Sequence, residues 1–302
     1  MASLDPDRLL DRRRLKRGVT VWRALAIVAL VAVALVGAAP FALDGGERVA
    51  RLWITGFIED DPARDHVIAE LRDDEAIKAV VLRLDSGGGT VVGGEALYLS
   101  LRSLAEVKPV VAVLGTTATS AAYMAALAAD HILAREASLT GSIGVLFQTA
   151  EFTALLQEIG VRTEAIRSGP LKAKPSPTEK LEDPTRQVMQ SVVSDIFELF
   201  LRLLMERRSL DRESALTLAD GRVFTGRQAV HAGLVDAIGG EDEARAWLAR
   251  VHDVPQTIPA TDVITGGGGL LDTLDAAIEH ALPARTFALD GLIAVWHPDI
   301  SD

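Results

Sequence analysis

The chain has 302 residues and a formal net charge of −11 at pH 7, and it contains no cysteine. This length allows one large domain or two modest ones with a sizeable core. The acidic balance argues against a nucleic-acid-binding protein, which needs a basic face. Without cysteine, the chain has no disulfide framework, thiol nucleophile or thiolate metal site.

The N-terminal region combines a basic cluster with a long apolar run. Five basic residues within residues 12–17 precede residues 19–39, in which Arg23 is the only charged residue. About 20 helical residues cross a ~30 Å hydrocarbon core, and Trp22 and Arg23 suit the interface. We therefore expect a cytoplasmic N-terminus over residues 1–18, a transmembrane anchor over 19–39 in the cytoplasmic membrane, and export of the remaining chain.

Two other interpretations of this run stay open. A cleaved signal peptide can use Val36-Gly37-Ala38 as its cleavage site, although its basic region would be unusually long. A buried core helix rarely follows five basic residues so closely. The uncleaved anchor is the interpretation we favour.

Strand-like and helix-like stretches alternate from residue 48 onward. The strand-like stretches occupy residues 48–56, 77–85, 108–115, 131–134, 137–147 and 161–169. The helix-like stretches occupy residues 61–74, 94–106, 118–127, 149–160, 178–208 and 241–251, with Pro184 breaking or kinking the long one near its start. This alternation with short connections predicts an α/β domain over residues 48–254.

The remaining residues, 255–302, form a C-terminal extension of unknown role. Gly266 to Gly269 make a flexible linker, and the apolar residues of 270–282 fall on one helical face.

Ser120 stands at the start of the small-residue stretch "ATSAAYMAAL", directly after a strand-like run. Serine is a favoured helix N-cap, so capping is its simplest role. A serine at a helix start also has backbone N–H groups and the positive end of the helix dipole beside its oxygen, which suits a nucleophile.

A glycine-rich turn, "LDSGGGTVVGG", follows the strand-like run of residues 77–85. Neither the GxxxxGK[ST] nor the GxGxxG phosphate-binding spacing is present. The turn is either a plain connection or a source of exposed N–H groups for an oxyanion hole.

A serine nucleophile needs a base. None of the six histidines sits in a motif that places it near Ser120, and we read His131 and His231 as structural. Lysine can act as a base when burial lowers its pKa from ~10.4. Lys172 and Lys174 in "RSGPLKAKPSP" are the candidates for such a base, although an isolated loop lysine is usually a solvated surface charge.

Five segments together resemble a known family. In chain order they are "VVLRLDSGGGTVVGGEAL", "KPVVAVLGTTATSAAYMAALAADHILA", "SLTGSIGV", "RSGPLKAKPSP" and "LADGRVFTGRQAVHAGLVDAIGG". They are similar to segments of the signal peptide peptidase SppA family, whose members are membrane-anchored serine/lysine peptidases. The resemblance covers about residues 48–250 and implies a Clp protease/crotonase-like superhelix of ββα units.

The resemblance assigns roles position by position. Ser120 falls on the nucleophile of the family. Lys172, in the pattern Ser-Gly-x-x-Lys, falls on its general base. Ser142, in "GSIGV", falls on the serine that orients the lysine.

Residues 85–89 fall on the family's Asn-Ser-Pro-Gly-Gly turn. By this match, the N–H groups of Gly88 and Ala121 hold the oxyanion, with Gly89 beside them.

This sequence departs from the family pattern at two places. Asp85 and Gly87 replace Asn and Pro, which predicts a more flexible turn with an extra carboxylate. Ala121 and Ala122 replace two glycines, which keeps the backbone donors but adds two methyl groups.

We therefore expect a serine endopeptidase that degrades signal peptides remaining in the membrane after preprotein processing. The resemblance also implies a ring-like homo-oligomer whose site can cross a protomer boundary, with no metal, cofactor or nucleic acid. Two alternatives are an inactive scaffold or binding protein of the same fold, and a crotonase-type acyl-CoA enzyme. An exported domain and a Ser/Lys pair fit the latter poorly.

Overall fold

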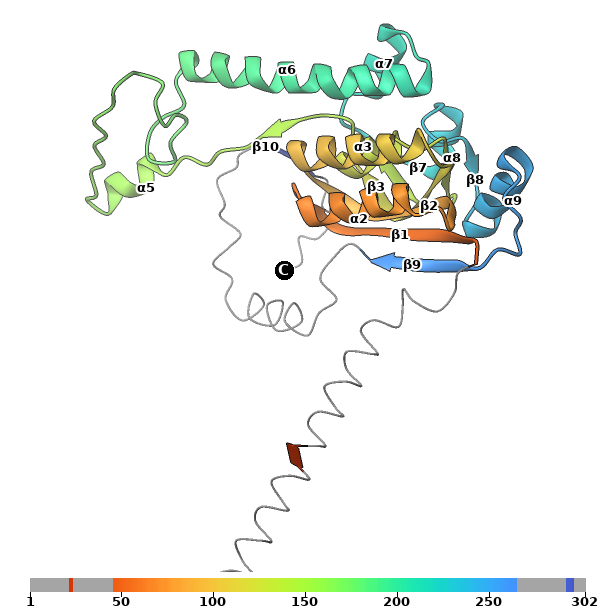
Figure 1. The fold of residues 1–302 in the computed structure, drawn as a ribbon. Helices are drawn as coiled ribbons and strands as arrows, with labels where there is room; N and C mark the ends of the chain where they lie inside the picture. The colour runs from red at the N-terminus through yellow and green to blue at the C-terminus, as the bar shows by residue number, and fades with distance from the viewer. Residues whose placement is uncertain (1–21, 24–45, 265–291, 296–302) are drawn as a thin grey trace, which may run out of the picture. The chain divides into compact units, whose positions relative to one another are not determined.

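The computed structural model describes residues 22–23, 46–264 and 292–295 (Figure 1). Most of the expected anchor, residues 19–39, and the helical face of residues 270–282 lie outside these ranges. Within the described ranges, no helix has both the length and the apolar character that crossing a membrane requires.

One compact unit begins at Glu47 and contains a ten-stranded mixed sheet. The strands are β1 (Arg48–Ile58), β2 (Ile77–Thr90), β3 (Val110–Thr119), β4 (His131–Ala134), β5 (Leu139–Gly141), β6 (Leu146–Phe147), β7 (Val223–Thr225), β8 (Ala237–Ile238), β9 (Ala260–Ile264) and β10 (Leu292–Val295). The expected α/β class is thus confirmed.

The central strands of the sheet are parallel. β9, β1, β2, β3, β4 and β8 pair in this order in parallel, and β5 adds in parallel to the far end of β3. Three antiparallel pairings join β7 to β5, and β10 to both β2 and β6. The C-terminal extension therefore contributes two strands, β9 and β10, to the sheet.

Eight helices accompany these strands in the part of the chain from residue 46 to 264. They are α2 (Pro62–Asp73), α3 (Val91–Ala105), α4 (Ala121–Ala126), α5 (Thr153–Glu158), α6 (Asp183–Arg208), α7 (Arg212–Leu218), α8 (Gly226–His231) and α9 (Glu241–His252). The start of α2 is as predicted: Pro62 is in its first turn, and the Asp61 side chain accepts from the N–H groups of Ala63 and Arg64.

Alternate side chains of the central strands enter two different cores. Val80, Leu82 and Leu84 of β2 join the larger core, which includes residues of α2, α3, α4 and α6. Ala79 and Val81 face the other side of the sheet, where α9 packs. Because parallel strands are covered on both faces, β2 and β3 read as continuous apolar runs.

Three of the predicted elements differ in the structure. Residues 161–169, expected as a strand, form no strand, and α5 is shorter than expected. The long helix α6 starts at Asp183, so Pro184 lies in its first turn and begins the helix instead of kinking it. A proline is compatible with this position because its missing N–H would have no partner there.

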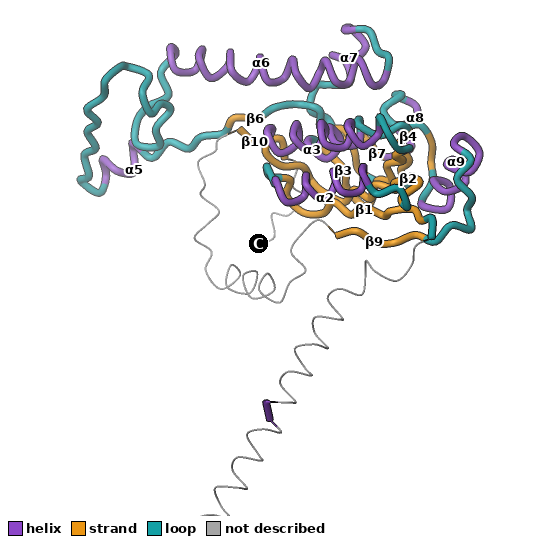
Figure 2. Tube along the Cα trace, in the orientation of Figure 1, coloured by secondary structure: helices purple, strands orange, loops and turns teal. Residues whose placement is uncertain are grey.

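The segment between β6 and α6, residues 148–182, extends away from the sheet, and we call it the arm (Figures 1 and 2). None of the residues of α5, its only helix among the described residues, is buried. The arm also exposes six large apolar side chains, which are Phe152, Leu155, Ile159, Val161, Ile166 and Leu171. Large exposed apolar patches on soluble proteins usually mark sites that contact another protein or a membrane. The exposed side chains of the arm are typical of such a surface.

Candidate active site

Ser120 connects β3 to α4 in a backbone conformation that few non-glycine residues adopt, with φ 56° and ψ −119°. Such a conformation costs on the order of 1–3 kcal/mol and persists where its surroundings impose it. Here the Ser120 N–H donates to the Gly141 carbonyl at 2.8 Å, and the residue is only 1% exposed. The side chain makes no capping hydrogen bond, so the expected capping role is wrong. The strained turn instead leaves the hydroxyl available for other partners.

The glycine-rich segment lies beside Ser120 because β2 and β3 pair as far as their ends. Ser86 pairs with Ala118, and the Thr119 hydroxyl donates to the Gly87 carbonyl at 3.0 Å. These contacts place the candidate oxyanion donors and the candidate nucleophile at the same edge of the sheet.

Within this segment, two glycines are required by the backbone. Gly88 has φ 116°, which only glycine adopts readily. A Cβ at Gly89 would lie 1.9 Å from the Ile58 carbonyl oxygen. The Gly88 N–H donates to the Ser86 hydroxyl at 3.1 Å, so an oxyanion would take the place of that hydroxyl as its acceptor.

The extra carboxylate that Asp85 brings to this turn has a hydrogen-bond partner in the structure. The Asp85 carboxylate accepts a hydrogen bond from the Thr117 N–H at 3.0 Å. A Cβ at Gly115 would lie 2.8 Å from the Asp85 Cγ, so Gly115 makes room for the carboxylate. Asp85 therefore ties the turn to the end of β3.

The methyl group of Ala121 is accommodated by a glycine on the facing helix. Ala121 is fully buried, and a Cβ added at Gly94 of α3 would lie 2.9 Å from the Ala121 Cβ. Gly94 thus supplies the space that the family obtains with a glycine after the nucleophile, and the backbone N–H of residue 121 is retained.

Ser142 directly follows Gly141, whose carbonyl accepts the hydrogen bond from the Ser120 N–H. It has φ 50°, and its N–H donates to the Arg222 carbonyl at 2.8 Å. The antiparallel pairing of β5 with β7 positions Gly141 opposite Val223. Ser120 and Ser142 are therefore connected through one residue, Gly141.

Lys172 is not brought to this site within the described residues of one chain. It is exposed in the arm and forms neither an ion pair nor a side-chain hydrogen bond among these residues. Lys174, two residues on, lies 3.1 Å from the Glu182 carboxylate and 3.6 Å from that of Glu179. Of the two lysines, only Lys172 has an ammonium group free of carboxylate contacts in this part of the structure.

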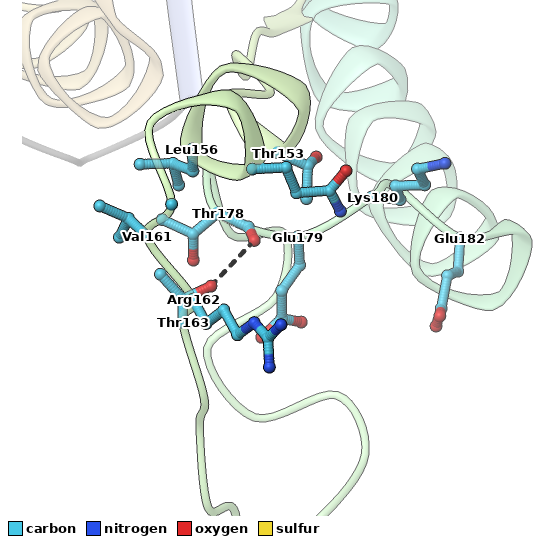
Figure 3. Close-up of a pocket in the computed structure, with 11 residues that line it drawn as sticks. Thr153, Leu156, Val161, Arg162, Thr163, Thr178, Glu179, Lys180 and Glu182 are labelled. Atoms are coloured by element: carbon cyan, nitrogen blue, oxygen red, sulfur yellow. Dashed lines mark hydrogen bonds between the residues drawn. The ribbon is translucent and has the colours of Figure 1, made fainter.

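A cavity of about 850 Å³ lies in the arm and not at Ser120 (Figure 3). Its lining residues come from α5 and from the two loop segments that follow it, and the Thr163 hydroxyl donates to the Thr178 carbonyl across it. None of the predicted site residues lines this cavity. No group of His, Asp or Glu side chains among the described residues is arranged to hold a metal ion.

Sequence reasoning missed the residues that hold the site together. Ser86, Thr119 and Thr140 are buried hydroxyl residues, and each hydrogen-bonds to the backbone of a neighbouring segment or of its own turn. Their only trace in the sequence is a run of hydroxyl residues at strand ends, which also occurs in ordinary turns.

Comparisons with known proteins show which family the chain resembles. Residues 102–255 match the model of peptidase family S49. A Synechocystis sp. protein provisionally named as a protease is 33% identical over 247 residues, which is 78% of this chain and 89% of the relative. The chloroplastic serine protease SPPA of Arabidopsis thaliana is 30% identical over 234 residues, which cover 72% of this chain and 34% of the relative.

A solved structure of a mutant of the 1510-N membrane-bound stomatin-specific protease is 12% identical, with a TM-score of 0.48. The match covers 73% of this chain and 99% of that one. A similarity this low assigns no function, and the Clp protease/crotonase-like arrangement stays a prediction.

The family match and the identity to these relatives place the chain in peptidase family S49 and confirm its resemblance to the signal peptide peptidase SppA family. The protein is a serine peptidase by family.

Proposed function

We propose that this protein is a membrane-anchored endopeptidase in which Ser120 is the nucleophile and Lys172 the general base. The observation that carries the proposal is the buried, strained turn at Ser120, held against Gly141 on one side and the glycine-rich segment on the other. Strain of this kind concentrates at functional sites, where the surrounding structure imposes a conformation that the chemistry requires.

The reaction proceeds by acyl transfer. The neutral Lys172 amine takes the proton of the Ser120 hydroxyl as the serine oxygen bonds to the scissile carbonyl carbon. The N–H groups of Gly88 and Ala121, with Gly89 beside them, stabilise the oxyanion. The Lys172 ammonium then protonates the leaving amine as the C–N bond breaks. Water then attacks the acyl carbonyl carbon while Lys172 accepts a proton from it, and Lys172 returns this proton to the Ser120 oxygen as the ester bond breaks. Ser142 orients the lysine throughout.

The substrates we propose are signal peptides that remain in the cytoplasmic membrane after preprotein processing. Support comes from the apolar run of residues 19–39, which would keep the exported domain beside the bilayer. An anchored site meets apolar peptides at the membrane at a higher effective concentration than a free enzyme does.

We further propose a homo-oligomer in which Lys172 reaches the Ser120 of a neighbouring subunit. The support is the exposed arm that carries Lys172, with its six apolar side chains, and the exposed Val188 and Val192 of α6. These two valines lie in the N-terminal half of α6, whereas Phe200, Leu201 and Leu204 of its C-terminal half are fully buried. A second copy is the natural cover for this apolar surface.

A fluorophosphonate probe and a synthetic signal peptide test the proposal together. The probe should label the protein at Ser120, and mass spectrometry should detect cleavage of the peptide; both should vanish in Ser120→Ala. If the intact protein neither reacts with the probe nor cleaves any peptide, the chain is an inactive scaffold of the same fold.

A further inference from the structure

The three backbone carbonyls that follow the short helix α4 all accept hydrogen bonds from arginine side chains. Arg207 donates from Nε to the Leu127 carbonyl at 2.8 Å and from Nη2 to the Ala129 carbonyl at 3.0 Å. Between them, Arg102 donates from Nη1 to the Ala128 carbonyl at 2.9 Å. We call Arg102 and Arg207 the arginine pair.

These three carbonyls need partners because the residues that carry them are buried. The last carbonyls of a helix receive no hydrogen bond from within the helix, and a buried carbonyl without a partner is unfavourable. The arginine pair therefore completes the C-terminal end of α4. Arg102 lies in the last turn of α3 and Arg207 in the last turn of α6, so two neighbouring helices hold this end.

The opposite end of α4 begins directly after Ser120, the proposed nucleophile. The helix has six residues, all buried, and four of them are alanine. Alanine methyl groups form only shallow ridges, so packing alone determines weakly where such a helix lies along its own axis. Polar contacts then decide its position.

Three sets of polar contacts hold α4 along its axis. At its start, the Ser120 N–H donates to the Gly141 carbonyl at 2.8 Å. In its middle, the Tyr123 hydroxyl donates to the Leu234 carbonyl at 2.8 Å. The arginine pair supplies the third set at its C-terminal end and is the only one of the three that uses charged donors.

The contact through Arg207 also connects the two parts of the proposed dyad. Figure 1 shows α6 leading from the arm back to the domain, on the side of the sheet that carries α3. The C-terminal half of α6 is buried in the larger core. One helix therefore follows the arm that carries Lys172 and ends at the arginine that holds the helix of Ser120.

We propose that the arginine pair positions Ser120 for attack by fixing the C-terminal end of α4. The inference rests on the proposed function, in which Ser120 is the nucleophile. Arg102 and Arg207 are positioning residues, and neither lies in the five segments that resemble the SppA family. A single short helix moves as a unit, and a displacement of about 1 Å at a reacting atom costs on the order of a hundredfold in rate.

Arg207→Met tests the proposal, because methionine keeps an apolar stem but cannot donate to either carbonyl. The matched control is Arg208→Met. Arg208 is the next residue of α6 and donates to the Gly233 carbonyl at 2.6 Å and to the Asp236 carboxylate at 2.8 Å. Each variant thus loses one charge and two hydrogen bonds, but those of Arg208 are to the segment after α8 and not to α4.

The first measurement is the rate at which a fluorophosphonate probe labels Ser120 in the full chain in detergent, together with steady-state kinetics on a reporter peptide. Arg207→Met should lower the labelling rate and kcat by at least about tenfold with KM nearly unchanged, because the serine is misplaced while the binding surface is intact. Arg208→Met should leave both rates nearly unchanged. Equal rates in the two variants overturn the proposal.

Arg207→Lys keeps the test decisive if Arg207→Met does not fold, which urea unfolding reports. One ammonium group lacks the planar fork with which the guanidinium reaches two carbonyls. The kcat of Arg207→Lys should therefore lie clearly below that of the unaltered chain. A kcat equal to that of the unaltered chain contradicts the proposal.

Hydrogen exchange measures the position of α4 without any catalysis. The amides of Ser120 and of residues 124–127 should exchange faster in Arg207→Met than in Arg208→Met, while those of β1 and β2 stay protected. Equal exchange of these amides in the two variants overturns the positioning role. If the unaltered chain is not labelled at Ser120, the proposed function fails, whereas faster exchange confined to Arg207→Met still upholds the effect of the arginine pair on α4.

Discussion

The backbone N–H of Ser120 donates a 2.8 Å hydrogen bond to the carbonyl of Gly141, the residue directly before Ser142. This contact holds the turn that carries Ser120, the proposed nucleophile, against the residue that precedes Ser142, the proposed orienting serine. Because the whole of β5, residues 139–141, pairs with residues 117–119 at the end of β3, this relationship depends on the register of two strands. A slip of one residue would separate the two hydroxyls.

The first prediction concerns the base. Ser120→Ala and Lys172→Ala should each abolish peptide hydrolysis without loss of fold, because nucleophile and base act as one unit. Lys174→Ala should be milder, since this ammonium is already engaged by Glu179 and Glu182. Ser142→Ala should lower kcat with little change in KM. Steady-state kinetics on a reporter peptide makes the comparison, and an inactive Lys174→Ala beside an active Lys172→Ala would move the base by two residues.

The second prediction concerns the hydrogen bond that joins the nucleophile strand to the glycine-rich segment. Thr119→Val keeps the side-chain shape but removes the donor to the Gly87 carbonyl. This hydrogen bond contributes about 1 kcal/mol. We expect its loss to raise the activation free energy by a similar amount, which lowers kcat roughly fivefold and leaves KM nearly unchanged. Thr116→Val, at an exposed position on the same strand, is the control. A normal kcat in Thr119→Val would show that the turn holds its geometry without this bond.

The third prediction concerns the contact between α3 and α4. Gly94→Ala should lower the free energy of unfolding by about 1–3 kcal/mol, because the new methyl group would lie 2.9 Å from the Ala121 Cβ. Adding Ala121→Gly should restore most of the loss, and Gly46→Ala, where no atom lies within 4 Å, should change little. Urea unfolding of these variants and of the unaltered chain measures the changes in the free energy of unfolding. The idea fails if the double variant is no more stable than Gly94→Ala alone.

The fourth prediction concerns pH and His131. Its ring stacks on Trp247 with centroids 4.8 Å apart, and burial lowers the pKa of His131 below its usual value, against the opposing effect of Asp236. As pH falls through about 6.5, the unfolded chain takes up a proton that the folded chain resists. The free energy of unfolding should therefore decline from neutral pH toward pH 5.

His131→Gln should flatten this decline, whereas a glutamine at the exposed His66 should not. Urea midpoints at several pH values report the difference between the two variants. Parallel pH profiles for all three chains would exclude His131 as the group responsible.

The fifth prediction concerns assembly. Co-expressed Ser120→Ala and Lys172→Ala chains should recover part of the activity that neither has alone, because mixed oligomers contain intact sites formed from two chains. Light scattering of the intact protein in detergent should give a mass above that of one chain. A monomer at micromolar concentration, or no recovery in verified mixed oligomers, would place the dyad within one chain.

The sequence alone determined those features that depend on local pattern. The alternation of apolar runs predicted the α/β class, and Asp61-Pro62 predicted the start of α2, because caps and periodicity act over a few residues. Family motifs singled out Ser120, Ser142 and the glycine-rich segment. The arm was the exception: residues 161–169 have the composition of a strand, but no described strand pairs with them.

Only the tertiary structure decided how the site is held. Gly94 compensates for Ala121, Asp85 binds Thr117, and Ser120 binds Gly141, and each of these pairs is more than 20 residues apart in the chain. The position of β10 in the sheet also depends on the tertiary structure, because its four apolar residues form no distinctive pattern in the sequence. Contacts of this kind depend on strand register and helix packing over the whole domain, and no local pattern encodes them.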